Sequence, residues 1–370
     1  MVKALPLLMA LMVVCLPAGC TGTREEFIPV EISDIALDSE RRLQYRAEEE
    51  TGILDSSGML YDDKQLEDYL NRLAAKLLPP GEGRPRFIVK VLRHPSLDAF
   101  AYPTGRLYFH TGLLAAMDNE AQLAAVMAHE ITHVQERHLA REFTSRKKKS
   151  AEEADSLRKI LTSVNCYSRL LESEADAAAV RMMVAAGYDP REAPRMLEHL
   201  KREIEEEKIK VRKADMIHPD IQERIKNTTD MAHNEYPGVE GLRNTEVFAR
   251  YTTPLLLDNA ELDLKRGNYQ AAERAIEKYL TGNQSDPRAY YLLGERHREG
   301  RPGNEEKART SYRKAIMLSQ TYADPYRALG LIDFKKGSRQ EAKKNLQHYL
   351  DLKPNARDRE HIKQYVNACE

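Results

Sequence analysis

The sequence predicts an α+β domain, mostly helical with a small sheet, followed by an all-α solenoid of helical repeats. Three observations predict this architecture. The 370 residues suffice for two or three folding units, helical patterns alternate with only two β-rich runs before about residue 235, and a helical unit recurs after residue 252. The 57 Lys and Arg residues nearly balance the 58 Asp and Glu residues, so no basic excess favours nucleic acid as a partner.

Residues 1–19 are expected to be a signal peptide. Lys3 precedes a short apolar stretch that cannot span a bilayer, and small residues follow it. The run 16–20, Leu-Pro-Ala-Gly-Cys, is similar to a bacterial lipobox, which implies an exported protein anchored by lipid on Cys20. By the same resemblance, Thr21 implies the outer membrane. Proline at the second position of the run departs from the usual leucine, which leaves plain secretion as the alternative.

Two further cysteines, Cys166 and Cys369, remain in the mature chain. An oxidising compartment permits a disulfide between them, and two unpaired thiols are an equally good interpretation. They are too few for a zinc site built from cysteines.

The next elements are a charged segment, a helix and a small sheet. Residues 21–63 are charged and have irregularly spaced apolar positions, and we expect them to wrap around the following domain. Apolar residues at helical spacing predict a helix over 61–78, which Pro-Pro-Gly closes. Two β-rich runs, 87–92 and 106–110, predict the sheet.

Two long helices follow the sheet. Asn119 and Gln122 form a capping-box pattern at the start of a helix predicted over 119–138. A second helical pattern covers 164–186 and stops at a glycine. Residues 141–159 are highly charged and are expected to be a solvated helix extension or loop, with a lid or a membrane-surface patch as the alternative. Residues 201–213 are similarly charged and are expected to be an exposed helix.

The C-terminal part of the chain is repetitive. After a linker expected at 236–252, units start near residues 253, 287 and 323, which are 34 and 36 residues apart. Tetratricopeptide repeats (TPR) have a period of about 34 residues, so we predict three TPR repeats over 253–356, with an unrelated helical bundle as the alternative. Because such hairpins bury their apolar faces only against neighbours, residues 357–370 are expected to form a capping helix.

The first long helix contains the sequence His129-Glu130-Ile131-Thr132-His133. A spacing of four residues places both imidazoles on one helical face, and Zn²⁺ can take two nitrogens from one such helix. Glu130 is close enough to act on a metal-bound water without becoming a ligand. The pentapeptide is short, so by itself it only suggests a metal site.

The second long helix offers a third ligand, which a catalytic zinc normally requires. Glu172 and Asp176 are four residues apart and share a helical face, whereas Glu174 points away from it. We therefore expect Glu172 to be the third ligand and Asp176 to hold the outer nitrogen of a zinc-bound histidine. Ordinary surface charge is the alternative for both carboxylates.

These motifs together resemble the gluzincin peptidases, a family that includes bacterial heat-shock proteases, CAAX prenyl proteases and mitochondrial Oma proteases. The resemblance is carried by His-Glu-x-x-His, by Ser-Arg-x-x-Glu-x-x-Ala-Asp at 168–176, and by residues 98–106 and 111–114. A soluble branch with C-terminal repeats is the closest match. The resemblance implies a zincin-like metallopeptidase domain over 20–235, with one Zn²⁺ per chain held by His129, His133 and Glu172.

The resemblance also implies quality control of bacterial envelope proteins by peptide hydrolysis. Glu130 would act as the general base toward a metal-activated water. An edge strand containing Arg106, Tyr108 and His110 would pair with an extended substrate. His218, in a His-Pro pair similar to one in the soluble branch, would either bind the metal as an inhibitory fourth ligand or stabilise the oxyanion; an exposed histidine without a role is the alternative.

Two functions of different classes follow from this reading. The first is a zinc endopeptidase that cleaves misfolded or stalled outer-membrane proteins, with the repeats recruiting a protein partner and the lipid anchor as the sole membrane contact. The alternative is a chaperone or assembly scaffold that acts through the repeats and has a silent zinc site. An intact Glu130 favours the enzyme, because a structural zinc site needs no general base.

Overall fold

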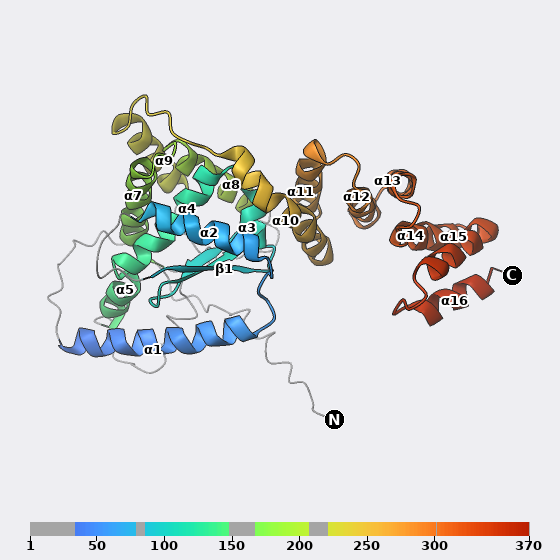
Figure 1. Ribbon diagram of the computed structural model, residues 1–370, viewed down its shortest axis with the longest axis horizontal. Coiled ribbons are helices and arrows are strands. Elements are labelled where there is room, and N and C mark those ends of the chain that lie inside the picture. Colours follow the sequence, from blue (N-terminus) through green and yellow to red (C-terminus); the bar gives the residue numbers. More distant parts are fainter. Residues whose placement is uncertain (1–33, 79–85, 148–166, 207–220, 301, 370) are drawn as a thin grey trace. The chain divides into compact units, whose positions relative to one another are not determined.

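The computed structural model describes residues 34–78, 86–147, 167–206, 221–300 and 302–369. It divides into two compact units, Met1–Tyr251 and Thr252–Glu370. The expected signal peptide with Cys20, and also Cys166 and His218, lie outside the described residues. The first unit (Figure 1) contains helices α1 (Asp34–Ser56), α2 (Lys64–Leu77), α3 (Thr111–Ala116), α4 (Glu120–Gln135), α5 (His138–Lys147), α7 (Arg169–Ala185), α8 (Glu192–Glu206) and α9 (Ile221–Asn234), and strands β1 (Ile88–Leu92), β2 (Ala99–Ala101) and β3 (Arg106–His110).

The three strands form a small mixed sheet in the order β1-β3-β2, which confirms the predicted sheet. Strand β3 is parallel to β1 and antiparallel to β2. The prediction that β3 is the edge strand is wrong, because strands pair with it on both sides. Strand β2 is an edge strand; it was not predicted, since three residues with two alanines give no alternating pattern.

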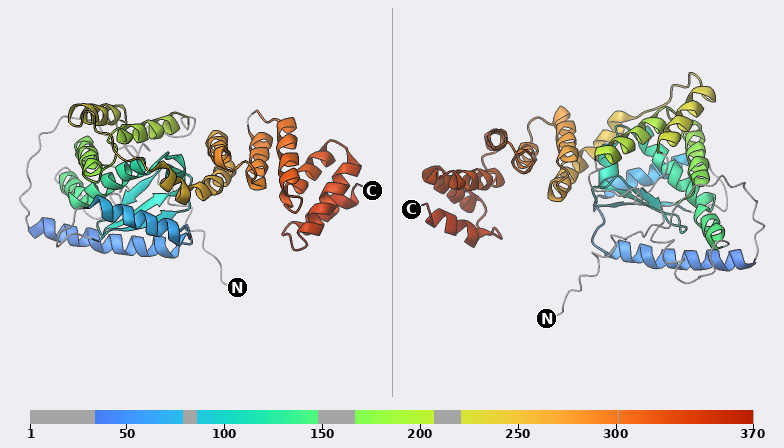
Figure 2. Two further views of the ribbon diagram at one scale, coloured as in Figure 1. Left: turned by 45° about the horizontal axis from the view of Figure 1, so that its top comes forward. Right: turned by 180° about the vertical axis from the view of Figure 1, so that it is seen from behind.

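The helices of the first unit enclose this sheet, with α1 on the side opposite to α8 and α9 (Figures 1 and 2). Helix α2 confirms the predicted helix over 61–78, and the Asp63 side chain caps it by accepting from the Leu66 backbone N–H at 3.0 Å. The sequence did not predict helix α1 within the segment 21–63. Among residues 40–56 of α1, for which burial is described, three are buried: Leu43, Ala47 and Thr51. This apolar stripe is too narrow to stand out in a charged sequence.

Helix α4 begins as predicted and ends earlier than predicted. Asn119 accepts from the Gln122 backbone N–H at 3.0 Å, as the capping pattern indicates. The helix stops at Gln135, and Arg137 has a positive φ of 52° before α5 starts at His138. The prediction of one helix up to residue 138 is therefore wrong. Arg137 adopts a left-handed backbone conformation that interrupts the helix, and because it is not a glycine the sequence gives no sign of the break.

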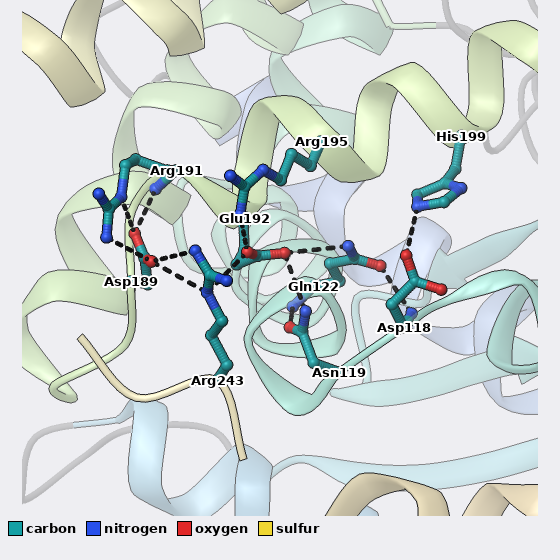
Figure 3. A network of polar contacts seen from close by, with 9 residues as sticks. All are labelled: Asp118, Asn119, Gln122, Asp189, Arg191, Glu192, Arg195, His199 and Arg243. Atoms are coloured by element: carbon teal, nitrogen blue, oxygen red, sulfur yellow. Dashed lines mark hydrogen bonds and ion pairs between the residues drawn. The ribbon is translucent and has the colours of Figure 1, made fainter. Parts of the chain in front are cut away.

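A network of polar side chains fixes the start of α4 (Figure 3). Glu192, which is 1% exposed, accepts from Asn119 at 2.9 Å and Gln122 at 3.0 Å, and Nε of Arg243 lies 3.0 Å from its carboxylate. The Arg243 carbonyl oxygen in turn accepts from the Glu120 backbone N–H at 2.9 Å. The segment 236–252, expected to be a linker, therefore packs onto the first unit at Arg243, and helix α10 begins within it.

Helix α10 (Thr245–Arg266) crosses the boundary between the units, and the second unit continues with short helices. A Cβ atom on Gly294 would lie 2.3 Å from the Tyr312 ring, and one on Gly330 would lie 2.6 Å from Leu346. Both glycines therefore permit close helix packing, while the TPR assignment stays a prediction. The remaining helices are α11 (Tyr269–Gly282), α12 (Pro287–Glu299), α13 (Glu305–Leu318), α14 (Asp324–Lys335), α15 (Arg339–Leu352) and α16 (Arg359–Asn367).

Among the helices that the structure describes, none has both the length and the apolar character of a membrane span.

Candidate metal centre

Three side chains from two packed helices converge in the first unit. His129 and His133 extend from one face of α4, and Glu172 extends from the first turn of α7. One potential ligand atom of each lies within 4.8 Å of the others. The two Nε2 atoms are 2.9 Å apart, and the Glu172 carboxylate lies 3.5 Å from His129 and 3.7 Å from His133. All three residues are buried.

This donor set fits a zinc ion. Two imidazole nitrogens and one carboxylate oxygen are ligands that catalytic zinc sites use, and three is their usual number of protein ligands. The donor atoms lie within 4.8 Å of one another, close enough for a single cation to contact all three. The structure thus brings together the three residues that the sequence pattern proposed as ligands.

Glu130 follows the first ligand on α4 and is 5% exposed. Burial raises the pKa of its carboxyl to about 8, with the nearby Glu172 and Asp98 acting in the same direction and His129 opposing them. A carboxyl group with a pKa near neutrality suits a general base, because it can both accept and release a proton at working pH.

Asp176 and Arg224 form a second layer around His129. An Asp176 oxygen lies 2.9 Å from Nδ1 of His129, as the sequence predicted. Arg224 donates to both Asp176 oxygens at 2.7 Å and lies 3.0 Å from Glu172. Burial opposes the charged form of His129, but its hydrogen bonds to Asp176 and Glu172 raise its pKa to about 10. Metal binding must therefore displace a proton from this ring.

Sequence reasoning missed Arg224, although a signal was present. Its neighbours on the buried face of α9 are Ile221, Thr228, Met231 and Ala232, at helical spacing. An arginine on an otherwise buried stripe predicts a carboxylate partner, because an unpaired buried charge is strongly unfavourable.

Tyr167 and His138 form the corresponding layer around His133, and neither was predicted. The Tyr167 ring stacks on the His133 ring with centroids 3.9 Å apart and an interplanar angle of 11°. Nδ1 of His138 lies 2.8 Å from Nδ1 of His133. Burial lowers the pKa of His138 to about 4, so its ring is neutral at neutral pH.

The side chains expected on the substrate strand lie in other contacts. Arg106 and Tyr108 both donate to Asp55, and Nδ1 of His110 lies 2.6 Å from the Ser96 hydroxyl. None of these three belongs to the cluster of metal donors. The expectation that these residues lie on an edge strand is wrong, because β3 is paired with β1 on one side and β2 on the other.

Two cavities adjoin the metal donors at opposite ends of β2. One, of about 520 Å³, is lined by Ala101 of β2, His133 and Leu43 of α1, among others. The other is narrower and mostly apolar, and Ala99 of β2 and Glu130 contribute to its lining. The edge strand thus extends from one cavity to the other.

Comparison with known proteins identifies the same region of the chain. Residues 61–151 and 154–232 match peptidase family M48. The beta-barrel assembly-enhancing protease of Escherichia coli K12 is 24% identical over 261 residues, which are 64% of this chain and 52% of that protein. The mitochondrial metalloendopeptidase OMA1 of Schizosaccharomyces pombe is 26% identical over 195 residues, 48% of this chain and 58% of that protein. The chain thus spans little more than half the length of these relatives.

Proposed function

We propose that the protein is a zinc-dependent endopeptidase of peptidase family M48, the family that matches residues 61–151 and 154–232. The observation that carries the proposal is the convergence of His129, His133 and Glu172, with Glu130 beside them. All four residues lie inside the region that matches the family.

Each polar residue of the site has a task in peptide hydrolysis. Bound zinc would polarise the scissile carbonyl and activate a water molecule. Glu130 would accept a proton from the attacking water and pass it to the leaving amine. Asp176 orients His129 through Nδ1, and Arg224 holds Asp176 and Glu172 in place while balancing their charge.

Substrate would bind in an extended form along β2 rather than along β3. An edge strand can add a further strand through its backbone groups, and β2 is an edge strand next to α4. The two cavities at Ala99 and Ala101 would then accept side chains on either side of the scissile bond. Pairing through the backbone suits unfolded polypeptides of varied sequence.

The cellular role we propose is quality control of outer-membrane proteins. One relative is described as a beta-barrel assembly-enhancing protease, and the sequence at 16–20 resembles a lipobox. Misfolded or stalled outer-membrane proteins would be the substrates, Cys20 the lipid anchor on the periplasmic side, and the helical repeats of the second unit the site that recruits a protein partner. His218, if it approaches the metal, would restrain the activity by acting as a fourth ligand.

Metal analysis tests the proposed site. Purified protein is expected to contain one zinc per chain, and a chelator is expected to abolish cleavage of an unfolded protein such as reduced casein, with recovery when zinc is returned. Cleavage that continues after complete removal of zinc would contradict the proposal. Stoichiometric zinc without any cleavage would favour the scaffold alternative.

A further inference from the structure

His138 contacts the metal ligand His133, and the proposed chemistry gives it no task. It is the first residue of α5 and is 0% exposed. Its Nδ1 lies 2.8 Å from Nδ1 of His133, and the two rings meet edge to face with centroids 4.8 Å apart. The other nitrogen of His133, Nε2, lies 2.9 Å from Nε2 of His129. One edge of His133 therefore faces the metal donors and the other faces His138.

With a metal bound at Nε2 of His133, the short distance between the two Nδ1 atoms determines which of them carries the proton. Two imidazole nitrogens in hydrogen-bond contact share one proton, so one donates and the other accepts. A neutral histidine that binds metal through Nε2 carries its proton on Nδ1. His133 is therefore the donor, His138 is the acceptor, and the proton of His138 is on its own Nε2.

The surroundings of His138 favour this arrangement. Its Nε2 lies 3.7 Å from a carboxylate oxygen of Glu174. Arg141 donates to both Glu174 oxygens, at 3.1 and 2.9 Å, and so fixes the carboxylate. A fixed negative charge on this side favours the tautomer with the proton on Nε2. The tautomer of His138 thus determines the tautomer of His133.

The break between α4 and α5 makes this contact possible. On one continuous helix, residues five apart point about 140° away from each other. Arg137, with its φ of 52°, turns the chain so that His138 comes back to His133. Tyr167 stacks on the face of the same ring at 3.9 Å. Both the edge and the face of His133 are thereby held.

We propose that His138 is a positioning residue that holds His133 in the Nδ1–H tautomer and in the orientation that presents Nε2 to zinc. This inference rests on the proposed zinc function. The other histidine ligand, His129, has the carboxylate of Asp176 in the equivalent place, at 2.9 Å. A neutral imidazole performs the task at His133 without adding a further negative charge beside Glu172 and Asp176.

Two substitutions separate hydrogen bonding from packing. His138→Phe keeps an aromatic ring of similar size and removes the acceptor, whereas His138→Asn gives up ring volume and keeps an acceptor oxygen near the position of Nδ1. Loss of such an outer partner typically weakens metal binding about 10–100-fold. We expect that loss of zinc affinity for His138→Phe, measured by competition with a chromophoric chelator, and near wild-type affinity for His138→Asn.

The visible absorption spectrum of the cobalt-substituted protein is a second measurement, which a change in packing alone does not alter. The visible absorption bands of the cobalt-substituted protein are expected to shift in His138→Phe and to stay close to wild type in His138→Asn. His233→Phe, at an exposed position of α9, is the matched control and should change neither measurement.

The inference is overturned if His138→Phe binds zinc as tightly as wild type with an unchanged cobalt spectrum. It is also overturned if the two variants lose affinity equally, since that result indicates a packing role. Failure of the proposed function is a different result, because the wild-type protein itself would then bind no zinc or cleave no substrate.

Discussion

Asp176 is the residue on which the orientation of His129 depends. Burial alone would raise the pKa of its carboxyl, but Arg224 and His129 hold that pKa below its usual value. Asp176 is therefore a carboxylate at neutral pH and can accept the Nδ1–H of His129. Arg224 is likewise charged at neutral pH, because its buried guanidinium lies beside the carboxylates of Asp176 and Glu172.

Glu130 leads to a prediction about the zinc-free protein. Its pKa is about 8 in the folded state and about 4.5 when unfolded, so between these values the folded state binds the proton more strongly. Stability must then fall as the pH rises through this window. His129, with a pKa raised to about 10, acts in the same direction above pH 6.5. We expect urea unfolding of zinc-free protein to show lower stability at pH 8 than at pH 6.5.

Glu130→Gln isolates the contribution of the carboxyl group. The substitution removes the titrating group and nearly keeps its shape, so the zinc-free variant should lose less stability over the same pH range. The difference in slope can reach about 1.4 kcal/mol per pH unit for one group. Equal slopes for the two proteins would mean that Glu130 ionises in the folded state as it does in the unfolded chain.

The sequence predicts the metal donors better than the residues around them. Spacing along one helix identifies His129 and His133, and a shared helical face identifies Glu172 and Asp176, because both arguments depend only on local geometry. Arg224 and Tyr167 reach the site through tertiary packing, which no single helix reveals. His138 reaches His133 only because the chain breaks between α4 and α5 at Arg137, which is not a glycine. A continuous helical pattern therefore places His138 on the wrong face.

At the scale of elements, the start of α4 depends on Glu192 of α8. Glu192→Ala would leave the buried amides of Asn119 and Gln122 without their acceptor, and each unsatisfied buried donor costs about 1–3 kcal/mol. Because two donors lose their acceptor, we expect a loss of stability of about 2–6 kcal/mol, measured by urea unfolding. Glu198→Ala, at an exposed position of the same helix, should have little effect. Equal stabilities of the two variants would show that the network does not fix α4.

Long amphipathic helices were predictable, whereas short or solvent-facing elements were not. Helix α2 has a broad apolar stripe and a capping aspartate, and its range follows from the sequence within a few residues. Strand β2 is too short to show an alternating pattern, and α1 buries few of its residues 40–56. The identity of the edge strand depended on β2, which is why the substrate strand was assigned incorrectly.

At the scale of the whole molecule, the chain combines a first unit that contains the match to peptidase family M48 with a second, all-helical unit. All the proposed zinc ligands lie in the first unit, and the three predicted repeats lie in the second. The enzyme and scaffold hypotheses therefore require different residues of the same chain. Only the enzyme needs Glu130, because capture of unfolded proteins by helical repeats requires no general base.

The most direct test of the account compares kcat/KM for an unfolded protein substrate between wild type and Glu130→Gln at equal zinc content. Glutamine has nearly the shape of glutamate but cannot accept the proton of water. Loss of general base catalysis is worth about 10²–10⁴-fold, and we predict a loss of that size with zinc fully retained. Glu136→Gln, at an exposed position directly after α4, should cleave as wild type does. Wild-type cleavage by zinc-loaded Glu130→Gln would contradict the proposed mechanism.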